Sequence, residues 1–152
     1  MIVITDSNIV FSALKTPNGV IAKILKAKSN IQFFAPDYLI IEVNNHFDKI
    51  VVGNIMTKKE LLIEKDLILS KIKILNVADI PKSKVIEALK IVENIDIDDL
   101  FFVAVHLLNN HKIWTGDKVL IDGLKAKGYN ICVTTAELKQ KIYKKPRQAN
   151  LF

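Results

Sequence analysis

The chain opens with the stretch Met1-Ile2-Val3-Ile4-Thr5-Asp6-Ser7-Asn8-Ile9-Val10, and this stretch decides the fold. Residues 1–5 form a short segment that is rich in β-branched side chains and apolar up to the threonine. Such a segment is typical of a strand buried on both faces of a sheet. The segment Asp6-Ser7-Asn8 then supplies side chains that cap helices, and it predicts a helix that runs through Leu14. A buried strand that passes directly into a helix is the first half of a βα unit.

The same alternation continues along the chain. Further strands are expected at residues 31–35, 73–77, 112–115 and 131–134. The remaining helices are expected at residues 20–28, 36–51, 57–72, 82–93, 96–110, 117–127 and 135–144. The segment Thr57-Lys58-Lys59-Glu60 is a capping box for one of them. Strands that alternate with helices pair in parallel through right-handed crossovers, with helices on both faces of the sheet. We therefore predict one α/β domain over residues 1–152, with a basic C-terminal helix and tail at residues 139–152.

Length and composition narrow the class of protein. The chain has 152 residues, half of them apolar, which suits one compact domain. No run approaches the roughly 18 apolar residues of a membrane helix, and Asp6 interrupts the first apolar run too early for a signal peptide. Cys132 is the only cysteine, which excludes a disulfide framework and predicts a thiol buried in a strand. We expect a cytoplasmic protein with no membrane partner.

The charge of the chain is a weak pointer to nucleic acid. The formal net charge is +6, which favours polyanionic partners through long-range attraction. Nearly all of the positive charge is lysine, and Arg147 is the only arginine. Abundant lysine, isoleucine and asparagine are also what an A/T-rich genome produces, so the lysines have an ordinary explanation as default surface residues.

Three aspartates stand where predicted strands and helices meet. Asp6 follows the first strand, Asp117 follows the strand at residues 112–115, and Asp99 lies in the first turn of a helix. The functional crevice of a parallel α/β sheet lies outside the carboxyl ends of its strands, so these side chains belong near one edge. Each alone has an ordinary role as a helix cap or as a complement to the helix dipole. Together they repel one another unless a cation lies among them.

Glu42 is the fourth acidic candidate. It interrupts the mostly apolar turn Tyr38-Leu39-Ile40-Ile41-Glu42-Val43, and burial of a carboxylate without a partner costs free energy. The helix can bury Ile40, Val43 and Phe47 while Glu42 tilts towards the sheet edge; a solvated flank is the alternative. The usual cation for a group of carboxylates is Mg²⁺ or Mn²⁺, and its usual partner is a phosphate. The four acids therefore indicate a metal-dependent phosphodiesterase.

Polar neighbours of the acids fit roles around a bound ion or its substrate. Asn8 is placed to orient the carboxylate two residues before it, and Thr115 to hydrogen-bond a carboxylate or a bound water. Lys118 offers a point charge for a phosphate. Asp96 is a further acid three residues before Asp99, and a helix cap explains it as well. Local capping and solvated surface stay open as explanations for these neighbours.

The same residues, in this order, resemble the PIN-domain ribonucleases. The resemblance rests on Ile4-Thr5-Asp6-Ser7-Asn8, Glu42 within a helix, Asp96-Ile97-Asp98-Asp99 ahead of Phe102-Val103-Ala104, and Trp114-Thr115-Gly116-Asp117-Lys118. No segment is specific alone, but the order and spacing span nearly the whole chain. The likeness is greatest to small bacterial and archaeal PIN proteins related to the VapC-like toxins. It implies a three-layer α/β/α sandwich with a central parallel sheet and Mg²⁺- or Mn²⁺-dependent cleavage of single-stranded RNA.

The resemblance also implies a site and partners. The acids of the family fall on Asp6, Glu42, Asp99 and Asp117. Thr115 takes the place of the family's hydroxyl before its last acid, and Asp96 matches an extra acid of some members. The three aspartates would bind one or two ions, directly or through water, and the glutamate would complete the group. An antitoxin protein and a homodimer, through the helices at residues 58–72 and 82–93, are the implied protein partners.

Other interpretations are weighed against the nuclease. A receiver or phosphatase site needs a second aspartate where Asn8 stands, and a dinucleotide-binding module needs a glycine-rich turn that Ser7-Asn8-Ile9-Val10 lacks. His106 replaces a small residue of the family and is interpreted as packing or surface. A metal pair of Glu42 with His46 is conceivable, but a surface or interface histidine is favoured. The alternative that stays open is a catalytically silent PIN-like scaffold that binds RNA or protein.

Overall fold

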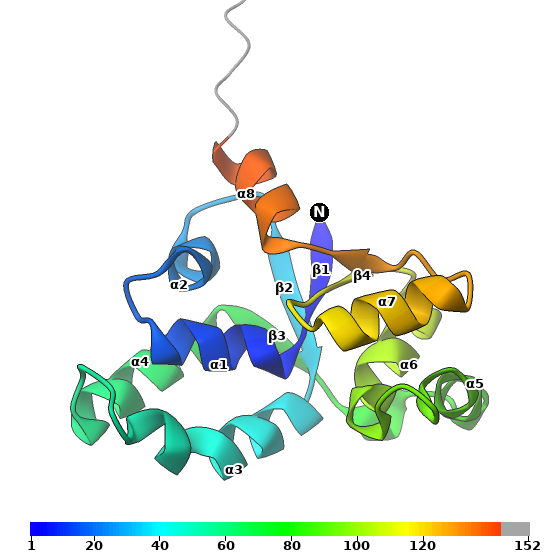
Figure 1. The fold of residues 1–152 in the computed structure, drawn as a ribbon, viewed down its shortest axis with the longest axis horizontal. Helices are drawn as coiled ribbons and strands as arrows, with labels where there is room; N and C mark the ends of the chain where they lie inside the picture. Colours follow the sequence, from blue (N-terminus) through cyan, green and yellow to red (C-terminus); the bar gives the residue numbers. More distant parts are fainter. Residues whose placement is uncertain (144–152) are drawn as a thin grey trace, which may run out of the picture.

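The computed structural model describes residues 1–143 and has a parallel sheet between two layers of helices (Figure 1). Within these residues the strands are β1 (Ile2–Thr5), β2 (Gln32–Pro36), β3 (Ile72–Leu75), β4 (Lys112–Trp114) and β5 (Cys132–Val133). The five strands lie in the order β3-β2-β1-β4-β5, and each neighbouring pair is parallel.

The helices form the two outer layers. They are α1 (Ser7–Lys15), α2 (Val20–Lys26), α3 (Tyr38–Val51), α4 (Lys58–Ser70), α5 (Lys82–Val92), α6 (Leu100–Asn109), α7 (Lys118–Ala126) and α8 (Thr135–Tyr143). Two short 3₁₀ turns, η1 (Val77–Asp79) and η2 (Ile97–Asp99), precede α5 and α6. Helices α1 to α4 lie on one side of the sheet and α5 to α7 on the other, while α8 packs against α2 (Figure 1). The predicted three-layer α/β/α sandwich with a central parallel sheet is confirmed.

Strand β1 occupies the centre of the sheet because it is the most completely apolar strand. Val3, Ile4 and Thr5 are fully buried, and the strand pairs with β2 on one side and β4 on the other. The chain runs from β1 outward to β2 and β3, and then returns to β4 and β5. The strand order therefore switches between β1 and β4, which is where an open parallel sheet has its functional crevice.

Helix α6 holds the second side of this crevice in place. Phe102, Val103, Ala104 and Val105 are all buried, because the helix contacts β1, β2 and β4 on one side and α5 on the other. Burial of apolar surface contributes about 25 cal/mol per Å², so α6 is among the best anchored elements. The acid at its N-terminus, Asp99, is thereby fixed relative to the sheet.

Several predicted boundaries differ from the structure, and the clearest differences are at β3 and at the start of α6. The third strand covers Ile72–Leu75, not residues 73–77, because the Asn76 side chain accepts a hydrogen bond from the Ala78 N–H at 2.9 Å and starts the turn η1. The helix predicted from residue 96 begins as the 3₁₀ turn η2, and α6 proper starts at Leu100. The capping box at the start of α4 is present, with both of its hydrogen bonds at 3.2 Å.

The predicted C-terminal helix is α8, and residues 144–152, which contain most of the predicted basic tail, lie outside the described residues. Cys132 lies in β5 as predicted and is half-buried. None of the helices within residues 1–143 has the length and hydropathy of a membrane-spanning segment.

Candidate metal centre

Asp6 follows β1 and occupies the N-cap position of α1, but its carboxylate does not cap that helix. The Thr115 hydroxyl donates to Asp6 Oδ2 at 2.7 Å, and the Ser7 hydroxyl donates to Asp6 Oδ1 at 3.4 Å. Asp6 is only 1% exposed. The ordinary role as a helix cap is therefore excluded for Asp6, and its carboxylate is directed to the end of the neighbouring strand β4.

Thr115 joins the two strand ends that form the crevice. Its hydroxyl oxygen accepts a hydrogen bond from the Asp117 N–H at 3.0 Å while the hydroxyl proton is donated to Asp6. Asp117 Oδ1 in turn accepts from two N–H groups in the first turn of α7, at 3.0 and 3.3 Å. Asp117 thus has its predicted ordinary role as the cap of α7. The same hydrogen bonds also fix its carboxylate at the crevice.

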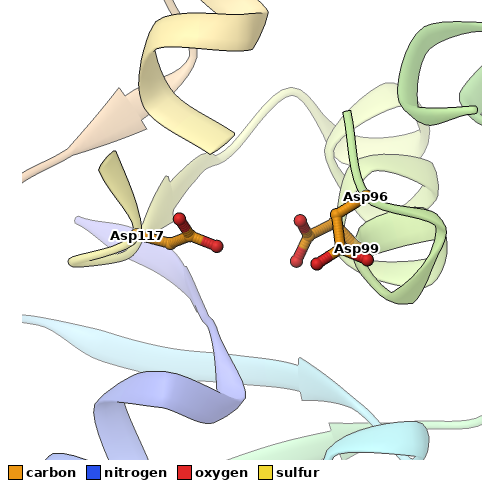
Figure 2. Close-up of side chains that lie close together, drawn as sticks. All are labelled: Asp96, Asp99 and Asp117. Carbon is orange, nitrogen blue, oxygen red and sulfur yellow. The ribbon is translucent and has the colours of Figure 1, made fainter. Parts of the chain in front are cut away.

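The opposite side of the crevice is built from the turn η2. Asp96 begins this turn and accepts a hydrogen bond from the Asp98 N–H at 3.0 Å. Asp96, Asp99 and Asp117 form an acidic group, in which one carboxylate oxygen from each residue lies within 4.8 Å of the others. Figure 2 shows Asp117 facing the other two acids across a gap. The η2 turn and the end of β4, which are separated in the chain by α6, therefore converge on one point.

Two buried carboxylate oxygens at this site have no hydrogen-bond partner among the described residues. They are Asp99 Oδ2 and Glu42 Oε1. Asp99 is only 6% exposed, and Glu42 is half-buried on α3. A buried carboxylate without a partner costs free energy, and a bound cation would offset that cost. A hard divalent cation takes oxygen ligands from carboxylates, and the residues present fit such an ion.

Burial and mutual repulsion raise the pKa of these acids. Burial first, and then the negative charges of Asp6 and other neighbouring acids, raise the pKa of Asp99 to about 8. Burial, opposed by the Ser7 hydroxyl and assisted by Asp6, raises the pKa of Glu42 to about 7. Burial also raises the pKa of Asp6, while the hydrogen bond from Thr115 lowers it. A divalent cation reverses this effect because it favours the charged carboxylates.

The structure brings the predicted acids towards one edge of the sheet and adds Asp96 to the closest group of carboxylates. Asp96, and not Asp6, lies with Asp99 and Asp117 in the acidic group. Asp6 and Glu42 adjoin this group, since the charge of each contributes to the raised pKa of Asp99. We call these five residues together the acidic site. Glu42 does tilt towards the sheet edge, which favours that interpretation over a solvated flank.

Two residues that influence the acidic site, Ser7 and Tyr38, were not predicted. Ser7 was assigned only to helix capping, yet its hydroxyl donates to Asp6 and lowers the pKa of Glu42. Asn8, which was expected to orient Asp6, is exposed and makes no hydrogen bond to it among the described residues. Tyr38 also lies close to the acidic site. Burial, and then the charges of Glu42 and other acids, raise the pKa of its hydroxyl. Its position four residues before Glu42 on one helix was the available signal.

The histidines take no part in the acidic site. His106 is buried, and its Nδ1 lies 2.7 Å from the carbonyl oxygen of His111, which agrees with a packing role. His46 Nδ1 lies 3.0 Å from the carbonyl oxygen of Glu42, within its own helix. Its ring packs against Phe11 with centroids 4.9 Å apart. A metal pair of Glu42 and His46 is therefore disfavoured.

Fold and site together define an α/β/α protein that gathers carboxylates at the carboxyl ends of its central parallel strands. The family model described as PIN domain matches residues 4–143, and the chain belongs to the PIN-domain family. Members of this family are generally metal-dependent nucleases. A comparison with curated proteins gives no match.

Proposed function

We propose that this PIN-domain protein is a divalent-metal-dependent endoribonuclease that hydrolyses phosphodiester bonds of single-stranded RNA. The observation that carries the proposal is the pair of buried, unpartnered oxygens, Asp99 Oδ2 and Glu42 Oε1, at the switch in strand order. A bound Mg²⁺ or Mn²⁺ would offset the cost of burying them. The formal net charge of +6 supports a polyanionic substrate.

The acidic group offers the oxygens that would hold the ion, from Asp96, Asp99 and Asp117, with Asp6 and Glu42 beside them. When bound, such an ion polarises the scissile phosphate and lowers the pKa of an attacking water. The chain itself supplies rigid positioning. The Thr115 hydroxyl holds Asp6 and the Asp117 backbone together, and the first turn of α7 holds the Asp117 carboxylate.

The proposed reaction is an in-line hydrolysis. A water oxygen forms a bond to phosphorus and the bond from phosphorus to the 3′-oxygen breaks, which leaves a 5′-phosphate and a 3′-hydroxyl. The water releases a proton to solvent, and the leaving 3′-oxygen takes one up. Lys118 is exposed at the start of α7 and would contact a phosphate of the RNA. RNA binding is therefore expected to weaken as the salt concentration increases.

Cleavage of a labelled single-stranded RNA tests this proposal. Wild-type protein and Asp6→Asn/Asp99→Asn are compared in Mg²⁺, Mn²⁺ and EDTA, and a DNA strand of the same sequence serves as a second substrate. Asp122→Asn, which removes an exposed acid on α7 outside the acidic site, is the matched control. Metal-dependent cutting that is lost only in the double variant supports the nuclease. Equal cutting by the double variant contradicts it, and binding without cutting favours the silent scaffold.

A toxin role and protein partners are further parts of the proposal, and they rest on the resemblance to VapC-like toxins. Leu62, Ile63 and Leu67 on α4 are 40%, 64% and 41% exposed, which supports a homodimer or an antitoxin contact over this helix. An antitoxin that places a basic side chain among the acids would compete with the metal ion. Growth arrest on expression of wild-type protein, absent with Asp99→Asn, is the expected result. Light scattering of the purified protein tests the dimer.

A further inference from the structure

A cleft with a volume of about 490 Å³ lies beside the acidic group, between α1 and the start of α7. The first turns of these two helices lie side by side (Figure 1). Asp117 belongs both to the lining of the cleft and to the acidic group. The cleft is therefore continuous with the acidic site, and its volume lies within the roughly 300–1,000 Å³ of small-ligand sites.

One face of α1 forms a wall of the cleft. Asn8, Phe11, Ser12 and Lys15 all line it, and their spacing of three, four and seven residues from the first places them on a single helical face. At a rise of about 1.5 Å per residue, this face extends about 10 Å away from the Asp6 end of the helix. The wall thus leads from the carboxylates to a cation.

The polar groups of the cleft are free to bind a ligand. Lys15 and Lys118 are exposed and take part in no ion pair within residues 1–143. The side chains of Asn8 and Ser12 likewise make no hydrogen bond inside this part of the chain. The two lysines come from opposite walls of the cleft, and both contribute positive charge that favours an anion there.

The apolar part of the cleft is rigid and open. Phe11 is half-buried, and its ring is held against His46 with centroids 4.9 Å apart. A methyl group added at Gly116, which also lines the cleft, would meet no atom within 4 Å. A fixed aromatic side chain beside open space suits a planar ligand, because base–aromatic stacking tolerates every base.

We propose that this cleft binds a nucleotide of the single-stranded substrate next to the scissile phosphate. A phosphate lies between Lys15 and Lys118, the base stacks on Phe11, and Asn8 and Ser12 contact the polar edge of the nucleotide. The inference rests on the proposed function for the identity of the substrate, but the binding it describes does not require cleavage.

Binding of a fluorescein-labelled single-stranded RNA decamer, followed by anisotropy as the salt concentration is varied, tests the cleft. The measurement uses Asp99→Asn protein in EDTA, so that no cleavage interferes. Adding Lys15→Ala and Lys118→Ala should weaken binding and reduce the salt dependence by about 0.7 log units per decade of salt for each lysine removed. The matched control is Lys112→Ala, which removes an exposed lysine at the start of β4, at the opposite edge of the sheet, that makes no ion pair within residues 1–143.

Phe11→Leu keeps an apolar side chain against the core and removes the aromatic ring. Loss of stacking should weaken RNA binding by roughly 5- to 150-fold. Unchanged thermal unfolding of each variant confirms that its fold is intact. The proposal would be overturned if the lysine variants and the Phe11 variant bind RNA with the same affinity and salt dependence as the Lys112→Ala control.

The two proposals fail in different ways. If wild-type protein cleaves RNA but the cleft variants bind it like the control, the cleft inference falls and the nuclease stands. If wild-type protein never cleaves and yet binds RNA through Lys15, Lys118 and Phe11, the nuclease falls and the cleft stands as a nucleic-acid site.

Discussion

The two sides of the acidic site differ in how their carboxylates are satisfied. On the strand side, Asp6 accepts a hydrogen bond from Thr115, and Asp117 caps the first turn of α7. On the helix side, Asp99 Oδ2 and Glu42 Oε1 are buried without any partner among the described residues. The strand-side carboxylates therefore have hydrogen-bond donors within the protein, whereas one oxygen of each helix-side carboxylate has none among the described residues.

This difference assigns separate tasks to the two sides. Hydrogen bonds keep the strand side in one geometry with or without an ion. On the helix side, burial raises the pKa of Asp99 to about 8 and that of Glu42 to about 7, so a cation that binds there would have to displace protons. Substitutions on the helix side should change metal binding most, and those on the strand side should change its geometry.

The largest effect is expected from removal of the charge of Asp99. Asp99→Asn should lower metal-dependent RNA cleavage by more than the roughly 10- to 100-fold that loss of an outer partner of a metal ligand costs. Mn²⁺ should raise the unfolding temperature of the wild-type protein but not that of Asp99→Asn. Asp122→Asn should leave both unchanged. Cleavage by Asp99→Asn at the wild-type rate would remove the helix side from the mechanism.

The next effect is a pH dependence of the metal-free protein. The pKa of Asp99 rises from 3.8 to about 8 on folding, and that of Glu42 from 4.5 to about 7. A raised carboxyl pKa means that the folded protein holds protons that the unfolded chain has released. Stability should therefore be highest below about pH 4 with respect to these groups, and should fall as pH rises to about 8.

Urea unfolding in EDTA between pH 5 and pH 8 measures this dependence. Each group contributes a slope of up to about 1.4 kcal/mol per pH unit within its window. Asp99→Asn cannot titrate at this position, so its stability should fall less steeply over the same range. If the stability of the wild-type protein rises over this range, the pKa values of Asp99 and Glu42 are not raised by folding.

A smaller effect is expected from Thr115 on the strand side. Thr115→Val removes the hydroxyl that holds Asp6 and the Asp117 N–H together, and should cost about 1–3 kcal/mol of stability. Mn²⁺ affinity should fall by about 10- to 100-fold, as for other outer partners of metal ligands. Thr115→Ser keeps the hydroxyl and should retain most of both. If Thr115→Val and Thr115→Ser behave alike, the hydroxyl does not organise the strand side.

The smallest effect is expected where α7 contacts the segment that leads into Asp96. A methyl group added at Gly123 would lie 3.0 Å from three side-chain atoms of Ile95. Gly123→Ala should therefore shift this segment at a cost of about 1–3 kcal/mol, partly offset by about 1 kcal/mol of helix propensity. Mn²⁺ affinity should fall and be restored when Ile95→Val is added. Asp122→Asn, which changes an exposed position of the same helix outside the acidic site, is the control.

Local patterns made most of the fold predictable from the sequence. The apolar run Met1–Thr5 predicted the buried strand β1, and the capping box at Thr57 predicted the start of α4 within a residue. The boundary at β3 was missed because the side chain of Asn76 turns the chain there, and a short apolar strand has no signal that outweighs such a contact. Element type was thus easier to predict than element ends.

The candidate site was predictable in composition but not in detail. Strand ends of a parallel sheet must share one edge, which was enough to bring Asp6 and Asp117 together. The choice of Ser7 over Asn8 as the partner of Asp6 depends on the rotation of α1 about its axis, and the sequence does not fix that rotation. The cleft likewise depends on how α1 and α7 pack, so no single stretch of sequence predicts it.

The most direct test of the account is the release of protons when Mn²⁺ binds. Calorimetric titrations of metal-free protein at pH 7, in two buffers with different ionisation enthalpies, give the number of protons released per ion. Because the pKa values of Asp99 and Glu42 are about 8 and about 7, the account predicts release of roughly one to two protons by wild-type protein, and fewer by Asp99→Asn. Tight Mn²⁺ binding without proton release, or no Mn²⁺ binding at all, would contradict it.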